Sequence, residues 1–254
     1  MNIDNVPALI ANPGAFIANN TIALSEINVN MPQGTWLPNT NNQQCRITLS
    51  QSGFIRLSVP MLRMLPGLFG GSLTAIPAYY LHAGDGGMAF NVHRHVDLPL
   101  IPFPPDPRFL FTTGMNGCSL IVTSVVPGGA PILPANHYRV FHDHDHRPLA
   151  TWHAAGYTVC FASYAHIADA GPIPPAFAAA NINVTTYNPN NYPWHYVVHG
   201  QYGVTMRCVT NFLHYDGGWH FHSCHFHDRA GVPNAVDTPP GVMPAASSTR
   251  SLPM

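Results

Sequence analysis

The stretch CSLIVTSVVPGGAPILPANHYRVFH, residues 118–142, decides the fold. Its first part, 118–126, is apolar and rich in β-branched side chains, which is typical of a buried strand. A segment rich in Pro and Gly follows, and residues 137–142 then predict a second strand. Two strands joined by such a loop pair in antiparallel fashion. We therefore expect His142, at the end of the second strand, to lie near Cys118, at the start of the first.

Short apolar runs punctuated by Pro and Gly continue along the rest of the chain, which has 26 Pro and 21 Gly in 254 residues. This spacing favours many short strands over long helices, so we predict a mainly β fold with some helix (α+β). Residues 45–60 alternate about Gln51-Ser52-Gly53 as a β-hairpin does. Further strands are predicted at 108–113, 156–164, 196–199, 204–213 and 219–227, and loops at the proline-rich 97–107 and at 170–194.

Composition divides the chain into three parts. Residues 1–44 are rich in Asn and Pro and predict an irregular N-terminal lead-in, whereas residues 45–230 carry the strand pattern of a single catalytic domain. Residues 231–254 are rich in Pro, Ala and Ser and predict a flexible C-terminal tail.

Charge is scarce in this chain and argues against several classes of partner. Only 8% of the residues are charged, against about a quarter in ordinary globular domains, and the formal net charge is −1. A basic surface for nucleic acid or anionic lipid is therefore not expected. All ten basic residues are Arg, so no lysine is present for ubiquitin attachment inside a eukaryotic cell, although an Arg-favouring genome gives the same composition.

The N-terminal residues and the cysteines indicate which cellular compartments are expected for this chain. The first residues, Met-Asn-Ile-Asp, lack the basic start and apolar stretch of a signal peptide, and no apolar run is long enough to insert into a membrane. The five cysteines are odd in number and irregularly spaced, which argues against a disulfide framework.

Cys118 and His142 together supply the two groups that attack on a carboxamide requires. The thiolate is the nucleophile, and the imidazole removes its proton and later protonates the leaving ammonia. Cys118 follows the predicted tight turn of residues 114–117, and backbone N–H groups in such a turn lower a thiol pKa and stabilise an oxyanion. His137 is the rival base, at the other end of the same predicted strand.

These residues resemble a known family, the toxin deamidases typified by the Burkholderia lethal factor and the catalytic domain of cytotoxic necrotizing factors. Those proteins carry a Leu-Ser-Gly-Cys turn, and Met115-Asn116-Gly117-Cys118 is similar to it. An apolar strand, a loop and the aromatic-His step Phe141-His142 follow in the same order. Thr112, six residues before the cysteine, matches a threonine shared by the lethal factor and the chemotaxis deamidase. The similarity covers about residues 108–143.

The resemblance implies a β-sandwich of the toxin-deamidase type and hydrolysis of a glutamine side chain in a host protein. Cys118 is then the nucleophile, His142 the base and acid, and Thr112 orients the histidine or contacts the substrate amide. Asn116, Gly117 and the Cys118 N–H are the expected oxyanion donors. The resemblance implies no cofactor.

The same resemblance predicts a bacterial effector or toxin, secreted or injected into the host cytosol, that acts on a host protein such as a small GTPase or a translation factor. The alternatives are another Cys-His hydrolase and a transglutaminase, which transfers the acyl group to an amine in place of water.

The sixteen histidines suggest a further alternative, a His-rich zinc-binding protein. On a strand, His220, His222 and Cys224 share one face, and these residue types bind zinc. Two other interpretations remain open: ordinary strand and loop residues, or a pH-responsive role, because many histidines gain charge together in acid.

Overall fold

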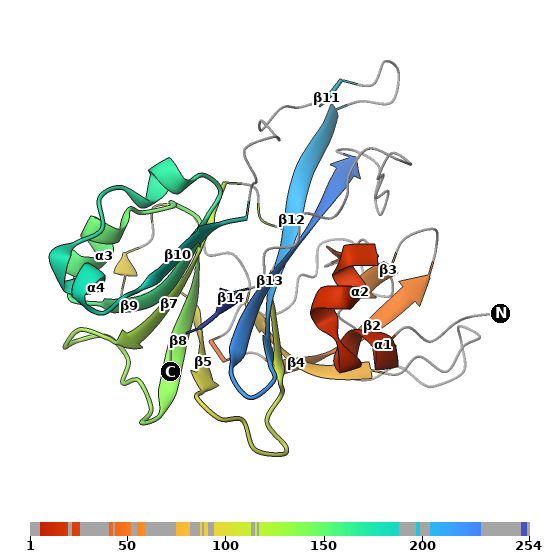
Figure 1. Ribbon diagram of the computed structural model, residues 1–254, viewed down its shortest axis with the longest axis horizontal. Helices are drawn as coiled ribbons and strands as arrows, with labels where there is room; N and C mark the ends of the chain where they lie inside the picture. Colours follow the sequence, from red (N-terminus) through yellow and green to blue (C-terminus); the bar gives the residue numbers. More distant parts are fainter. Residues whose placement is uncertain are drawn as a thin grey trace.

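The computed structural model describes residues 6–19, 22–25, 41–42, 44–51, 55–58, 75–81, 87, 89–90, 94–112, 115, 117–187, 197–198, 204–229 and 250–252 (Figure 1). Strands dominate these residues, which confirms the predicted mainly β fold with some helix. Among the described residues, no helix has both the length and the apolar character of a membrane span.

The elements are α1 Val6–Ala11, α2 Pro13–Asn19, β1 Ile22–Ser25, β2 Gln44–Gln51, β3 Ile55–Ser58, β4 Ala75–Leu81, β5 His95–Pro99, β6 Phe109–Thr112, β7 Ser119–Val125, β8 His137–Asp143, α3 Leu149–Ala154, β9 Thr158–Tyr164, η2 Ile167–Ala170, α4 Pro175–Ala179, β10 Asn183–Thr186, β11 Val197–Val198, β12 Val204–Tyr215, β13 Trp219–Arg229 and β14 Arg250–Ser251.

The strands form two mixed sheets. Over the described residues, the larger sheet has the order β1-β3-β2-β4-β6-β12-β13-β14, with β11 paired to β12, and the smaller has the order β10-β9-β7-β8-β5. Figure 1 shows β12 and β13 running through the middle of the molecule, with β7 to β10, α3 and α4 to one side and α1, α2, β2 and β3 to the other. The chain passes from the larger sheet to the smaller between β6 and β7.

The two sheets share one apolar core, to which each contributes alternate side chains of its strands. We call the face of each sheet that carries these side chains its inner face. Leu110, Leu213 and Phe221 lie on the inner face of the larger sheet, and Val122 and Phe161 on that of the smaller. A fully buried Leu, Val or Phe side chain contributes about 1.5–3 kcal/mol, so this core is a principal source of stability.

The outer face of the smaller sheet carries a second core, closed by α3 and α4. Trp152 of α3 lies against Phe141 of β8, with ring centroids 5.1 Å apart, and edge-on to Tyr157, also at 5.1 Å. All three residues are buried. Because β7 is covered on both faces, its consecutive apolar residues Leu120, Ile121 and Val122 are all buried.

The hairpin predicted from residues 118–142 is confirmed. β7 and β8 pair antiparallel, with Ser119 opposite Asp143 and Leu120 opposite His142. The hairpin predicted over residues 45–60 is also present, as β2 and β3.

The prediction of a loop over residues 97–107 is wrong at its start. Asp97 and Leu98 belong to β5, which pairs antiparallel with β8. Arg139 of β8 donates to both carboxylate oxygens of Asp97, at 2.7 and 2.8 Å, and this buried ion pair joins the two strands. β5 is an edge strand, and its only proline stands at its last position, where a missing N–H costs little.

Two other segments contain more structure than the sequence predicted. The loop predicted at 170–194 includes α4 and β10, and β10 pairs in parallel with β9. Near the C-terminus, β14 pairs with β13, and Leu252 is buried in the shared core. These last residues, placed by the sequence in a flexible tail, are therefore part of the folded sheet. In the N-terminal lead-in, β1 pairs in parallel with β3.

Candidate active site

Cys118 lies where the chain enters the smaller sheet, directly before β7. Its side chain is a thiol, not half of a disulfide, and 8% of the residue is exposed. Gly117 before it has φ +97°, a conformation that residues with a side chain rarely adopt. The glycine of the predicted turn is therefore required by the backbone, and it turns the chain so that the cysteine faces the shared core.

His142 stands one strand away from Cys118 on the same inner face. Leu120 is directly opposite His142, and directly opposite residues of an antiparallel pair point to the same side of the sheet. Cys118, two residues before Leu120, is on that side too, which makes it a diagonal neighbour of His142. Such neighbours have Cα atoms about 7–8 Å apart, within reach of an imidazole. The register thus brings the two predicted catalytic side chains together.

His137, the rival base, is at the other end of β8. It pairs with Pro99 of β5, and its Nδ1 lies 2.8 Å from the carbonyl oxygen of Ala135. Cys118 and His137 therefore stand at opposite ends of the β7–β8 hairpin, and the geometry favours His142.

The segment before Cys118 is anchored to the larger sheet, and residues 114 and 116 of the predicted tight turn lie outside the described residues. Met115 is buried and pairs with Val209, its N–H donating to the Val209 carbonyl at 2.7 Å and its carbonyl accepting at 2.9 Å. The Asn211 amide also lies 2.8 Å from the Met115 sulfur. Asn116, a predicted oxyanion donor, lies outside the described residues. The crossing is thus fixed two residues before Gly117.

Thr112 is the last residue of β6, on the inner face of the larger sheet. It is buried, and its hydroxyl donates to the main-chain carbonyl of Asn211 at 3.1 Å. The hydroxyl therefore ties the end of β6 to β12, at the point from which the chain crosses to Cys118. The structure places Thr112 at the same end of the two sheets as the Cys-His pair.

Tyr187 holds the main chain at the cysteine, a role that the sequence did not indicate. Its hydroxyl donates to the Cys118 carbonyl at 2.7 Å, and its ring is buried in the shared core. Its own N–H donates to the Tyr164 carbonyl at 3.0 Å. The peptide group after Cys118 is therefore fixed by the residue that follows β10, 69 residues further along the chain, and no short-range pattern signals this contact.

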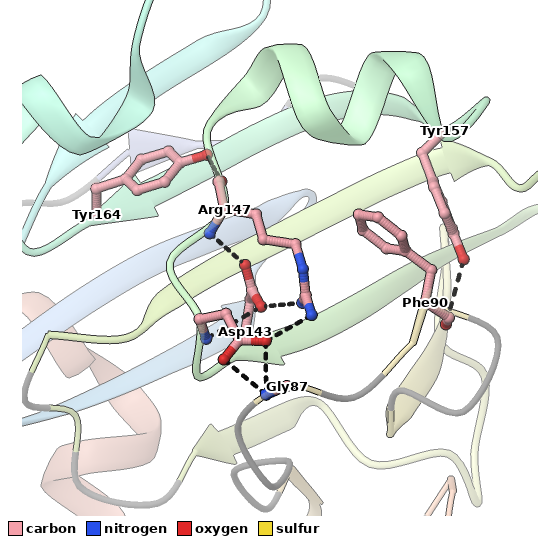
Figure 2. A network of polar contacts seen from close by, with 7 residues as sticks. Gly87, Phe90, Asp143, Arg147, Tyr157 and Tyr164 are labelled. Carbon is pink, nitrogen blue, oxygen red and sulfur yellow. Dashed lines mark hydrogen bonds and ion pairs between the residues drawn. The ribbon is translucent and has the colours of Figure 1, made fainter.

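The carboxylates next to His142 belong to a network with Arg147 (Figure 2). The Arg147 guanidinium donates to Asp143 at 2.6 Å and to Asp145 at 2.5 Å, and the Arg147 N–H donates to Asp143 at 2.7 Å. The Gly87 N–H donates to both Asp145 oxygens. Arg147 also lies over the Phe90 ring, 4.8 Å from its centroid. The network fixes the end of β8 from which His142 projects, and its carboxylates already bind a cation, the guanidinium.

The zinc alternative is not supported by an assembled set of ligands. His220 and His222 do share one face of β13, the outer one, as alternation requires. The Cys224 side chain lies outside the described residues. In the described part of the chain, no group of three or more His, Cys, Asp or Glu side chains could hold a metal ion.

His222 instead packs in an aromatic stack. Its ring is 4.8 Å from that of Phe212 and nearly parallel to it, and His214 lies 6.4 Å away. Neither ring nitrogen of His222 hydrogen bonds to another group of the described structure. Burial lowers the pKa of His222 to about 3 and that of His214 to about 4, because a charged imidazolium is poorly solvated there. Both are therefore neutral at neutral pH.

Cys160 gives a contrast to Cys118. It lies in β9, and its thiol is 3.4 Å from the Val122 carbonyl. Burial raises the pKa of the Cys160 thiol to about 12, so at neutral pH it is protonated and a poor nucleophile. Cys160 is packed, partly buried, against the shared core.

No protein-family model matches this chain, and no curated protein matches its sequence significantly.

Proposed function

We propose that this chain is a cysteine-dependent protein-glutamine deamidase. The observation that carries the proposal is the placement of Cys118 and His142 as diagonal neighbours on the inner face of the smaller sheet. The resemblance of residues 108–143 to the toxin deamidases supports it and suggests the toxin-deamidase type of β-sandwich. The proposal includes a role for the chain as a bacterial effector that reaches the host cytosol.

The proposed reaction has two stages. His142 takes the proton of the Cys118 thiol, the thiolate attacks the carboxamide carbon, and ammonia leaves with that proton as a thioester forms. Water then attacks the thioester, and glutamate and the thiol are released. The Cys118 and Gly117 N–H groups are the proposed donors to the oxyanion.

Two further residues have positioning roles in this proposal. Tyr187 immobilises the Cys118 peptide group through its carbonyl, which preorganises the N–H groups around the turn. Thr112 fixes the end of β6 through its bond to the Asn211 carbonyl, and so the start of the crossing to Cys118. Neither needs to touch the substrate for these roles.

The burial of Cys118 limits which substrate groups can reach its thiol. Since only 8% of Cys118 is exposed, a thiol attack requires a substrate group that is narrow and extends well beyond its backbone. A glutamine side chain meets this requirement better than a peptide bond, which brings two neighbouring side chains with it. Access therefore favours a deamidase over a peptidase, with a surface glutamine of a host protein as substrate, a small GTPase or a translation factor being the classes that the resemblance suggests.

Intact-mass spectrometry on candidate host proteins tests the proposal. Incubation with the wild type should add about 1 Da at one glutamine, the change from an amide to an acid, and Cys118→Ala should abolish it. Cys160→Ala is the matched control, because it removes another thiol of the smaller sheet, one that is partly buried and protonated at neutral pH, and it should leave the reaction intact. Conversion by Cys118→Ala at the wild-type rate would overturn the proposal. Incorporation of an added primary amine in place of water would reassign the chain to the transglutaminases.

A further inference from the structure

Among the described residues with a buried polar atom that has no hydrogen-bond partner, Ser163, Ser223 and Asn211 stand toward one end of the inner faces. The Ser163 hydroxyl, the Ser223 hydroxyl and the Asn211 side-chain oxygen make no hydrogen bond to any group in the described part of the chain. All three residues are fully buried. A buried polar atom without a partner costs about 1–3 kcal/mol, so such atoms in a folded protein call for a ligand or an ordered water.

The first two of these residues each lie one inward-facing position beyond a pair of rings that meet across the shared core. The rings of Phe161 in β9 and Phe221 in β13 are in contact, with centroids 5.2 Å apart. One inward-facing position further along the same strands stand Ser163 and Ser223. Both steps run toward the same end of the sheets, because β9 and β13 each lead from their phenylalanine toward the end where β6 stops and β7 starts.

Asn211 completes the group from the larger sheet. It is directly opposite Ser223 in the β12–β13 pair, and its amide nitrogen is already engaged by the Met115 sulfur. The Asn211 side-chain oxygen, which has no partner among the described residues, offers an acceptor, whereas each serine hydroxyl can donate or accept.

A water molecule between the two serines would give both hydroxyls a hydrogen-bond partner. Packed sheets stand about 10 Å apart, and a serine hydroxyl extends only a short way from its backbone. One water can therefore bridge a gap between serines on the two sheets. A buried water needs about two to four polar partners, and the two serines and Asn211 supply three.

This group adjoins the Cys-His pair. Ser163 is directly opposite Leu120 in the β7–β9 pair, just as His142 is opposite Leu120 in the β7–β8 pair. Cys118, two residues before Leu120, is therefore a diagonal neighbour of both Ser163 and His142 on one face.

We propose that Ser163, Ser223 and Asn211 form a buried water site that supplies the water for hydrolysis of the Cys118 thioester. The catalytic half of this inference rests on the proposed function, whereas the water site itself does not. In the hydrolytic step the water oxygen bonds to the thioester carbonyl carbon and a water proton passes to His142. The carbon–sulfur bond then breaks, the Cys118 sulfur takes the electron pair and regains a proton from His142, and the carboxylic acid leaves.

A crystal structure and a double-mutant cycle test the water site. The crystal structure should show a water within hydrogen-bond distance of the Ser163 and Ser223 hydroxyls. Ser163→Ala and Ser223→Ala should each lower the Tm by about 2–4 °C, the effect of one hydrogen bond in a chain of this size. The double variant should lose less than the sum, since both residues hold the same water.

The matched control cycle pairs Ser163→Ala with Ser119→Ala. Ser119 is also buried with an unpartnered hydroxyl among the described groups, but it is on the outer face of the same sheet. Its effect should add to that of Ser163→Ala. A dry gap in the crystal structure, or serine-to-alanine changes that raise the Tm and add, would overturn the water site.

The hydrolytic role is tested with p-nitrophenyl acetate, which needs no knowledge of the host substrate. It should acetylate Cys118, seen as a mass gain that Cys118→Ala lacks. The acetyl thioester should hydrolyse about tenfold more slowly in Ser163→Ala and Ser223→Ala, with the rate of its formation unchanged, because only the second stage uses the water.

The outcomes separate the two proposals. If Cys118 is not acetylated, the nucleophile and hence the proposed function fail, while the crystal structure still decides the water site. If acetylation proceeds and hydrolysis is equally fast in the serine variants, the hydrolytic role of the site is overturned and the deamidase proposal is untouched.

Discussion

Two buried histidines in this molecule have opposite surroundings. His142 is on the inner face of the smaller sheet, beside a thiol and next to a strand end that a charged network fixes. His222 is on the outer face of the larger sheet, stacked on Phe212, and its ring nitrogens meet no hydrogen-bonding group among the described residues. Both are almost fully buried, at 1% and 4% exposure.

The difference shows that burial of an imidazole does not by itself indicate chemistry. His222 contributes as an aromatic ring and loses its capacity to take a proton, because burial lowers its pKa to about 3. His142 has a nucleophile on the same face, at a place where the backbone turns through a glycine of positive φ. The neighbouring groups, and not the residue type, separate a candidate base from a packing residue.

The largest expected effect comes from exchanging each histidine for an aromatic ring. His142→Phe removes the proposed base and should slow deamidation by about 10²–10⁴-fold. His222→Phe keeps the stack on Phe212 and should leave the rate unchanged. The rate of mass change on the host protein, or of Cys118 acetylation by p-nitrophenyl acetate, measures both. Equal rates in the two variants would show that His142 is no more important for the reaction than His222, and so is not the base.

The charged network is expected to give the next largest effect. Arg147→Met keeps a long side chain near Phe90 but leaves the fully buried Asp143 carboxylate without its cation, which should cost about 3 kcal/mol in the free energy of unfolding. Urea denaturation measures the loss. The double variant with Asp143→Asn should recover part of it, because the uncompensated charge is gone. If the double variant is no more stable than Arg147→Met, the network does not hold the end of β8 by charge.

The part of the candidate site that sequence reasoning predicted is local. Residues 118–142 form one hairpin, and its two ends must meet whatever the rest of the chain does. The alternation of side chains then puts Leu120 and His142 on one face. From the sequence alone, His142 is therefore expected near Cys118 if the strand lengths match, and the register of the two strands supplies that match.

The rest depends on contacts between distant segments. Tyr187 reaches Cys118 from just after β10, and Met115 pairs with Val209, 94 positions later. Neither contact leaves a short-range pattern. β5 was missed for a different reason, because the prolines after it hid a strand that is held by the Asp97–Arg139 ion pair. Asn211 stands in an apolar run, where no periodicity distinguishes a polar residue of the core.

Acid should lower the free energy of unfolding through the two buried histidines of the larger sheet's outer face, His214 and His222. The folded pKa values of His214 and His222, about 4 and about 3, are below the unfolded value of about 6.5. Their contribution is therefore fully present above pH 6.5 and decreases as the pH falls from 6.5 toward 4, since the unfolded chain takes up protons first. At pH 5 each should cost on the order of 2 kcal/mol relative to neutral pH.

Unfolding in urea at several pH values measures this loss, and His222→Phe isolates one of the two contributions. The variant should lose less stability than the wild type between pH 6.5 and 4, by up to about 1.4 kcal/mol per pH unit, the value for one proton. If the free energy of unfolding changes with pH in the same way in wild type and variant, burial does not keep His222 neutral.

The smallest effect is expected at two glycines of similar conformation that have different neighbours. Gly117 precedes Cys118 and Gly217 lies in the β12–β13 turn, with φ +97° and +74°, and a Cβ added at either would meet no atom within 4 Å. Alanine at either position should therefore cost only the backbone strain, about 1 kcal/mol. Thermal unfolding should show the two variants to be alike in stability.

Activity should separate these two variants. Relaxation of the strain at Gly117 rotates the peptide groups that carry the proposed oxyanion donors and moves the Cys118 thiol, and a misplacement of about 1 Å can cost on the order of 10²-fold in rate. Relaxation at Gly217 changes only an exposed turn. Rates of Cys118 acetylation should thus fall in Gly117→Ala and not in Gly217→Ala. If the rates are equal while stability falls equally, the turn serves the fold alone and the oxyanion donors lie elsewhere.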